Sequence, residues 1–236
     1  MMRLSLTAPL LGALMILSAG CSMDFEPSLV EEGTILALRA TQDEANDQQF
    51  ELEALTVGVD ALTWTACGAP WVGTENGLEC VTPTWTLTPS ESEQKATLDL
   101  GAVPIPDEYK DLLESVYVLV DGDGDEVVPA VLSVSLTAAP NNPELVGVLL
   151  DGVAPDEWAG TNETEIEVAP VWSSDEASEG TTTSFYTTAG AMDPWRITED
   201  GITTLTLEGE ETNLTLYVIS RFLGEGATWT KVEVSL

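Results

Sequence analysis

Apolar and polar residues alternate along this chain in short segments that are separated by turn residues. In residues 49–57, for example, Phe50 and Leu52 fall on one face while Glu51 and Glu53 fall on the other. Alternation with a period of two predicts a strand with one buried face. Many such strands, rich in Val, Thr, Leu and Trp, are typical of an antiparallel β-sandwich. The sequence therefore predicts an all-β protein.

The expected strands form two series, and each series ends in a hairpin. In the last segment the alternation of Trp229 with Val232 and Val234 changes phase, which predicts a β-bulge. Residues 106–114 hint at one short helix. The expected strands are residues 35–40, 49–57, 61–66, 85–87, 96–100, 116–120 and 127–137, followed by 145–150, 163–168, 182–187, 202–207, 213–221 and 227–236.

A Pro-Asn-Asn-Pro segment, residues 140–143, separates the two series. Two prolines around two asparagines interrupt both helices and strands, which is typical of a linker. We therefore expect two immunoglobulin-like antiparallel β-sandwiches in series, one over residues 34–139 and the other over 144–236. The alternative is a single larger β domain.

The N-terminus has the order of a secretory signal peptide. Arg3 is followed by the mostly apolar residues 4–17 and by small residues that lead to Cys21. The apolar stretch is too short to be a membrane-spanning helix of the mature protein. We expect residues 1–20 to be removed and residues 21–33 to form an acidic tether. Ordinary secretion and an uncleaved anchor are the alternatives.

A signal that ends in Gly20-Cys21 resembles the lipobox of bacterial lipoproteins. The resemblance implies that Cys21 is diacylated on sulfur, becomes the first residue, and is acylated on its amine, so that a lipid attaches the protein to a membrane. Ser18 stands where a branched apolar residue is common. Ser22 resembles the residue that sorts better-known lipoproteins to the outer membrane, so we expect that location.

The chain is strongly acidic, with 41 acidic and 7 basic residues and a formal net charge of −34. Removal of Arg3 with the signal would leave 6 basic residues and a net charge of −35. Such a surface repels nucleic acid and anionic lipids and attracts cations and basic partners. Solubility, or adaptation to salty water, also explains this charge. We therefore expect no nucleic-acid partner.

The chain contains no histidine. This excludes Ser-His-Asp and Cys-His catalysis, imidazole proton transfer and His-ligated metal sites. Hydrolysis by paired carboxylates is the remaining enzymatic alternative. With 41 acidic residues, however, two neighbouring carboxylates indicate nothing by themselves. We therefore expect no enzymatic activity.

If Cys21 carries lipid, Cys67 and Cys80 remain as an even pair in an oxidising compartment. The segment between them is rich in glycine, which is typical of a loop. We expect a structural disulfide, which would contribute roughly 3 kcal/mol in the chain-entropy model. Two buried free thiols or a reactive pair are the alternatives, and neither Cys-x-x-Cys spacing nor a basic neighbour favours reactivity.

An acidic loop with alternating glycines contains Asp121, Asp123, Asp125 and Glu126. Carboxylates at alternate positions can converge on a hard cation, so these four residues are a candidate for a weak calcium site. The helix-loop-helix calcium motif does not fit, because Glu126 stands at its glycine position. The alternative is a hairpin turn, in which Asp-Gly pairs supply positive φ angles. We expect no other cofactor.

Seven tryptophans raise the alternative of a glycan-recognition surface. Trp64, Trp85 and Trp229 lie on expected strands, which favours a place in the core. Tryptophans in loops can form a recognition platform or close the open ends of a sandwich. The tryptophans in loops are Trp71, Trp158, Trp172 and Trp195.

Several segments resemble uncharacterised surface lipoproteins of gliding Gram-negative bacteria. They are residues 33–40, 62–67, 184–190 and 217–221, the last continuing toward Trp229. Residues 222–226 replace the Asp- and Arg-containing turn that is usual there. The resemblance implies tandem immunoglobulin-like domains at the cell surface and no established activity. We therefore expect a lipid-anchored cell-envelope protein with a non-catalytic structural or adhesive role and an unidentified protein or glycan partner. A calcium- or glycan-dependent recognition module is the alternative.

Overall fold

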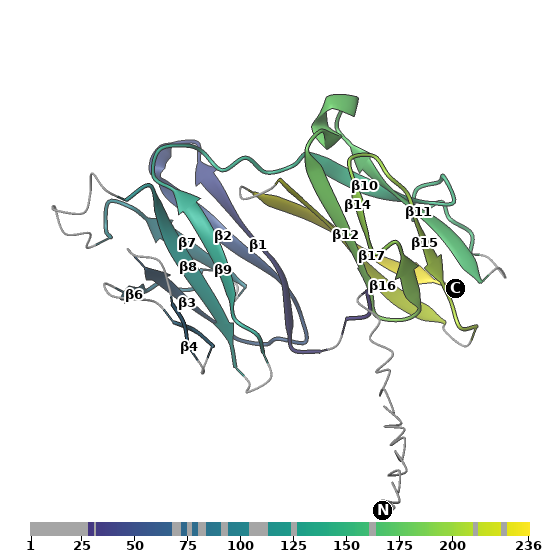
Figure 1. Cartoon of the computed structure of the whole chain (residues 1–236), viewed down its shortest axis with the longest axis horizontal. Coiled ribbons are helices and arrows are strands. Elements are labelled where there is room, and N and C mark those ends of the chain that lie inside the picture. The colour runs from purple at the N-terminus through teal and green to yellow at the C-terminus, as the bar shows by residue number, and fades with distance from the viewer. Residues whose placement is uncertain are drawn as a thin grey trace, which may run out of the picture.

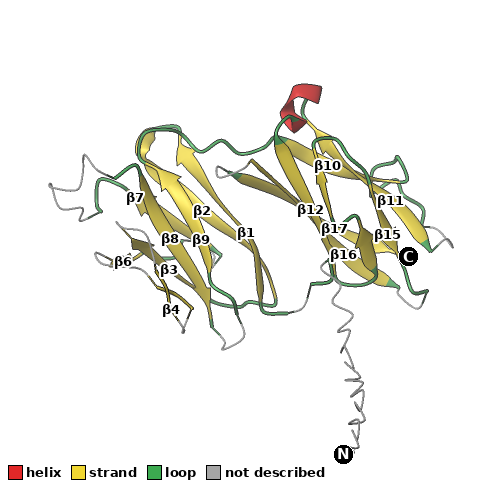
Figure 2. Ribbon diagram, viewed as in Figure 1, coloured by secondary structure: helices red, strands yellow, loops and turns green. Residues whose placement is uncertain are grey.

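A computed structural model of the chain shows an all-β protein built from antiparallel sheets (Figure 1, Figure 2). A short 3-10 helix, η1 (Asp175–Ser178), lies between two of the strands. The structure describes residues 28–30, 32–67, 72–74, 77–79, 84–90, 94–103, 113–123, 127–160, 164–209, 212–222 and 226–236.

The first sandwich consists of two sheets that enclose one hydrophobic core. A three-stranded sheet has the order β1 (Thr34–Asp43), β2 (Asn46–Val57) and β7 (Lys95–Asp99). A four-stranded sheet has the order β6 (Thr84–Thr86), β3 (Leu62–Cys67), β8 (Ser115–Gly122) and β9 (Ala130–Ser135). A small separate hairpin joins β4 (Val72–Thr74) and β5 (Gly77–Glu79).

Alternating residues of both sheets fill this first core, as the sequence pattern predicts. Phe50, Leu52 and Ala54 of β2 are buried, while the intervening Glu51 is exposed. From the facing sheet, Trp64 is 0% exposed and is the largest fully buried side chain of the described residues. The alternation seen in the sequence therefore corresponds to the two faces of each strand.

The second sandwich encloses a separate core between two four-stranded sheets. One sheet has the order β10 (Leu145–Leu150), β11 (Glu165–Trp172), β15 (Thr203–Thr206) and β13 (Ala191–Asp193). The other has the order β14 (Arg196–Thr198), β12 (Thr181–Thr187), β16 (Asn213–Phe222) and β17 (Ala227–Ser235).

The two sandwiches repeat the same strand order. In each, the second strand pairs on one side with the first strand and on the other with the strand that precedes the final hairpin, giving β1-β2-β7 and β10-β11-β15, and the second sandwich adds β13 beside β15. The facing sheets, β6-β3-β8-β9 and β14-β12-β16-β17, also correspond strand by strand. This two-sheet arrangement is of the immunoglobulin type that the sequence predicts. The exact domain boundaries, residues 34–139 and 144–236, stay a prediction.

The predicted bulge in the last strand is wrong. Pairing of β16 with β17 runs without a register shift from Asn213 opposite Ser235 to Arg221 opposite Ala227. Trp229 therefore faces away from Val232 and Val234, and its ring meets Arg39 of the first sandwich. Trp229 departs from the apolar alternation of its strand because it makes this contact between the sandwiches.

Residues 28–30, at the end of the expected tether, are attached to the second sandwich. The backbone of Thr187 accepts a hydrogen bond from Val30 at 2.9 Å and donates one to Ser28 at 2.8 Å. The Ser28 hydroxyl accepts a further bond, 2.8 Å long, from the Met192 backbone nitrogen. The chain thus contacts the second sandwich before it enters β1 of the first.

Candidate binding groove

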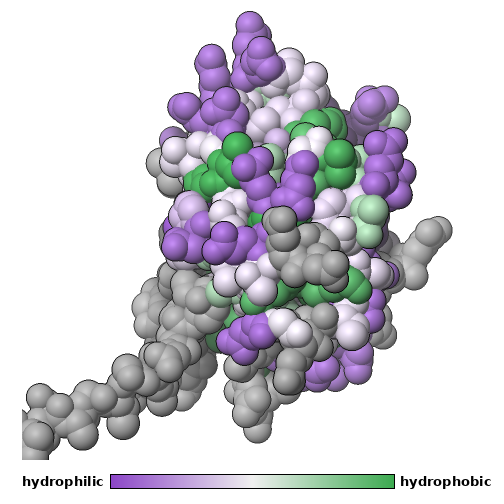
Figure 3. Space-filling model, turned by 90° about the vertical axis from the view of Figure 1, so that its right-hand side faces the viewer, coloured by the Kyte–Doolittle hydropathy of each residue, from purple (hydrophilic) through white to green (hydrophobic). Residues whose placement is uncertain are grey.

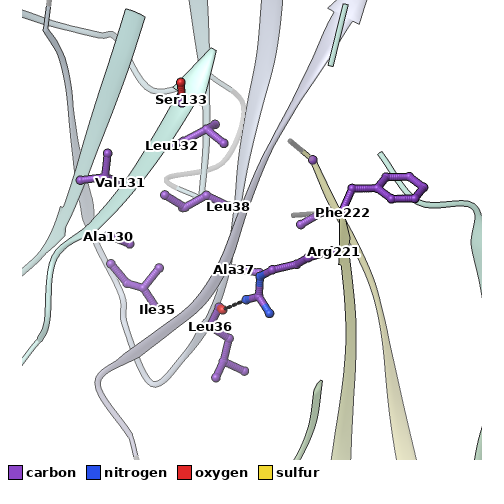
Figure 4. Close-up of a pocket in the computed structure, with 12 residues that line it drawn as sticks. Ile35, Leu36, Ala37, Leu38, Ala130, Val131, Leu132, Ser133, Arg221 and Phe222 are labelled. Carbon is purple, nitrogen blue, oxygen red and sulfur yellow. Dashed lines mark hydrogen bonds between the residues drawn. The ribbon is translucent and has the colours of Figure 1, made fainter. Parts of the chain in front are cut away.

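Strand β9 belongs to the first sandwich (Figure 1), and a groove runs along it, lined by residues of both sandwiches. Its central part has a volume of about 350 Å³ and is shown in Figure 4. Neighbouring hollows of about 460 Å³ and 250 Å³ continue it in the two directions along β9. Leu132 and Ser133 line both the central and the larger hollow, and Ile35 and Ala130 line both the central and the smaller one.

The lining of the groove is mainly apolar or neutral, although the protein is highly acidic. Among the described lining residues, Glu32 and Arg221 alone carry a charge. Strand β9 itself has the sequence AVLSVS, without a charged side chain. Pro129 precedes it, at a position where an edge strand tolerates proline.

One edge of β9 has open backbone groups. β9 pairs with β8 and is the last strand of its sheet. The Leu136 nitrogen donates to the Glu114 oxygen at 2.9 Å, which marks these opposite residues as a hydrogen-bonded pair. Because such pairs alternate along an antiparallel ladder, the backbone groups of Val131, Ser133 and Ser135 point away from β8. No described residue hydrogen-bonds to these backbone groups.

The neighbouring edge strand, β1, is closed by side chains. Arg221 donates to the Leu36 carbonyl at 2.6 Å, the contact drawn in Figure 4. Asn142 donates to the Ala40 carbonyl at 2.9 Å and accepts a hydrogen bond of 3.1 Å from the Ala227 nitrogen. Side chains that cover an edge protect it from pairing with another strand. The open edge on this side of the first sandwich is therefore that of β9.

The Arg221 side chain is partly buried between the sandwiches and is held there by a hydrogen bond to the Leu36 carbonyl. Desolvation lowers the pKa of its guanidinium, and the nearby Tyr186 hydroxyl acts in the opposite direction. A buried cation requires several hydrogen-bond acceptors to offset the loss of water. The Leu36 carbonyl supplies one of them.

A second arginine joins the sandwiches through its flat face. The Arg39 guanidinium lies 4.3 Å from the centre of the Trp229 ring, and its Nε donates to Glu53 at 2.9 Å. The salt bridge holds the guanidinium in place while its face contacts the ring, which is a favourable cation–π arrangement. We call Arg39, Asn142, Arg221 and Trp229 the junction residues.

Gly226 allows the linker to approach the start of β17. A Cβ atom at this position would lie 2.3 Å from Asn142 Oδ1 and 2.4 Å from the Asn141 carbonyl oxygen. Any other residue would push Asn142 away from its contacts with both sandwiches. The close approach therefore requires glycine.

The residues predicted for lipidation and for the disulfide are placed in part. Cys67 is 1% exposed at the end of β3. Cys21 and Cys80 lie outside the described residues. Lipidation of Cys21 and pairing of Cys67 with Cys80 stay predictions.

The predicted calcium loop is also placed in part. Asp121 lies on β8, and Asp123 accepts a 3.3 Å hydrogen bond from the Ala61 nitrogen, which closes the end of the β3–β8 pair. Asp125 and Glu126 lie outside the described residues. Within the part of the chain that the structure describes, no three Cys, Asp or Glu side chains are grouped to hold a metal ion. Calcium binding by the four residues stays a prediction.

The tryptophans of the second sandwich lie mainly against its core. Trp158 and Trp195 pack on the core, and the Trp158 ring nitrogen donates to Asp151 at 3.0 Å. Trp172 lies at the end of β11 and is partly buried, and Trp71 lies outside the described residues. Figure 3, which views the end of the molecule formed by the second sandwich, shows hydrophobic residues in separate patches among hydrophilic ones. This arrangement resembles a closed sandwich end more than a flat aromatic platform.

In the first sandwich, Trp64 lies in the core as predicted, and Trp85 packs against that core while partly exposed. Trp229 lies at the junction, so the prediction that it belongs to a core is wrong.

The chain matches no protein-family model and no curated protein. Solved structures that match it include a chain titled as part of a cytokine receptor complex. That chain shares 12% sequence identity, with a TM-score of 0.27, over 84% of this chain and 96% of its own length. So low a score carries no argument about fold or function. Within the described residues, no helix has the length and apolar character needed to cross a membrane.

The sequence did not reveal the groove or the junction residues. The contacts that form them join residues as far apart in the chain as Leu36 and Arg221, which alternation within one segment cannot indicate. One usable signal was the rarity of basic residues, of which the chain has 7. In so acidic a protein, the few arginines are candidates for specific contacts.

Proposed function

We propose that this protein is a lipid-anchored component of the bacterial cell envelope, in the outer membrane, with a non-catalytic structural or adhesive role. The observation that carries the proposal is the signal-like N-terminus that ends in Gly20-Cys21. Acylation of Cys21 would bind the mature protein to a membrane without a spanning helix. A Cys67–Cys80 disulfide would suit the same oxidising compartment.

The position of residues 28–30 supports an anchor close to the folded body. Ser28 and Val30 hydrogen-bond to the second sandwich, and Cys21 precedes Ser28 by seven residues. Even a fully extended segment of this length reaches no more than about 25 Å. The lipid would therefore hold the second sandwich near the membrane surface, while the junction residues fix the first sandwich to it.

Substitution Cys21→Ser tests this proposal. A serine cannot carry the thioether lipid, so the variant should leave the membrane fraction and appear in soluble form, or remain as an uncleaved precursor. Ser22→Ala, which keeps the cysteine, should stay with the membranes as the unchanged protein does. Fractionation and immunoblotting measure both distributions. Membrane association of a Cys21→Ser variant that has lost residues 1–20 would show that the lipid is not the anchor.

A further inference from the structure

We propose that the open edge of β9 binds an extended, cationic peptide segment of another protein, which adds to the sheet as a further strand. The proposal names the type of partner for the adhesive role proposed above and in that sense rests on it. The binding site consists of the backbone groups of Val131, Ser133 and Ser135 together with the groove beside them.

The backbone geometry fits strand addition. Three alternate residues of β9, Val131, Ser133 and Ser135, have backbone groups that point away from β8. Their N–H and C=O groups have the spacing of an antiparallel ladder. A peptide that pairs with them recovers hydrogen bonds that water otherwise makes, which is the basis of recognition by β-strand addition. The hollows from Val128 to Ala139 extend along the whole strand, so there is room for about seven residues of roughly 3.3 Å each.

The groove lining sets the side chains that the partner requires. Residues of β1 (Ala37, Leu38), of β9 (Ala130, Leu132) and of the second sandwich (Phe222, Ala227) line the central hollow. Alternate side chains of an added strand would point into this lining, which favours Val, Ala or Thr at those positions. The remaining side chains would point to solvent.

Charge selects a basic segment over a second copy of this chain. The formal net charge of −34 attracts cationic peptides and repels another molecule with the same charge. Glu32 adds a negative charge at one end of the groove, while the positive charge of Arg221 in its central part is held by the Leu36 carbonyl. Because salt screens charges beyond about 8 Å at physiological ionic strength, the net charge mainly speeds association, and the backbone pairing holds the complex.

The open edge also differs from other edge strands of the protein. β17 carries Lys231 and Glu233, and charged side chains on an edge hinder pairing with another strand. β1 is covered by the junction residues. β10 lacks charges as well, and its exposed Val146 lies outside the lining of the groove and offers a control position there.

The test uses the full-length protein in detergent and a fluorescent peptide of about seven alternating lysine and valine residues. Binding is measured by fluorescence anisotropy. A second peptide has the same sequence and charge but carries N-methyl groups on alternate residues, which prevents strand pairing. We expect the first peptide to bind and the second to bind at least about tenfold more weakly.

Variant Ser133→Pro tests the site itself. Ser133 is exposed and its N–H points away from β8, so proline blocks the open edge without removing a bond of the β8–β9 ladder. We expect at least about tenfold weaker peptide binding for this variant. Ser133→Ala, which keeps the N–H, and Val146→Lys, on β10, should bind as the unchanged protein does. Val131→Pro repeats the test at a second open position should Ser133→Pro fail to fold.

Three results would overturn the proposal. Equal binding of both peptides, or of both proline variants and the unchanged protein, would indicate charge attraction alone. No binding at millimolar peptide would indicate that the edge does not accept a strand. Self-association that Ser133→Pro removes would identify a second copy as the occupant. Each is independent of membrane fractionation, so the proposed lipid anchor can fail while strand addition stands, and the reverse.

Discussion

Replacing Trp64 with alanine should lower the free energy of unfolding by about 3–5 kcal/mol, the usual loss when a large aromatic residue leaves a core. Trp64 is fully buried between the sheets of the first sandwich, opposite Val120 on β8. Alanine would remove the apolar contacts of the indole ring and leave a cavity that the sheets fill in part. Urea denaturation, followed by circular dichroism, measures the loss.

Trp85→Ala is the matched control for this prediction. Trp85 belongs to the same sandwich but is only partly buried beside its core, so its removal should cost clearly less. Equal losses at the two positions, or a loss below about 1 kcal/mol at Trp64, would mean that the first core is not packed around Trp64.

Replacing Arg221 with alanine should cost roughly 1.5–3 kcal/mol, the range for a hydrogen bond to a charged group. The variant leaves the Leu36 carbonyl without its donor and opens the contact between β16 and β1. Amide hydrogen exchange should therefore rise in β1 near Leu36 and at the end of β16 that carries Arg221. Urea denaturation and exchange mass spectrometry give the two measurements.

Arg221→Lys separates charge from geometry in this experiment. An ammonium group keeps the charge but lacks the planar, forked guanidinium that donates to the Leu36 carbonyl. We expect an intermediate loss for lysine. An alanine variant within 0.5 kcal/mol of the unchanged protein, with the same exchange in β1, would show that Arg221 does not join the sandwiches.

Alternation in the sequence was sufficient to predict the long strands. Residues 145–150 were predicted with the same bounds as β10, and the inward face of β2 was assigned correctly from Phe50 to Ala54. The short strands β13 (Ala191–Asp193) and β14 (Arg196–Thr198) were missed, because three residues cannot display a period of two. β4 and β5 were missed for the same reason.

Contacts between the sandwiches could not be predicted from local patterns. Trp229 broke the alternation of its strand because it meets Arg39, and the sequence alone offered a bulge as the simplest explanation. The sequence indicated only that Asn142 belongs to a linker, although its side chain hydrogen-bonds to the backbone of both sandwiches. Such residues depend on a partner that is distant in the chain.

The candidate binding groove along β9 could not be predicted from the sequence for a related reason. In the sequence, the segment with Val131, Ser133 and Ser135 has the pattern of an ordinary half-buried strand. That pattern does not show that the strand lies at the edge of its sheet. β9 carries no charged side chain in a chain with 41 acidic residues, and this is the local sequence feature on which the proposed strand addition depends.

Mass spectrometry of the N-terminal peptide of the membrane-extracted protein tests the central claim most directly. We predict a peptide that begins at Cys21 and carries acyl chains on the sulfur and on the amine. An unacylated peptide, or one that begins before residue 21, would contradict lipid anchoring and with it the proposed place of this protein in the cell envelope.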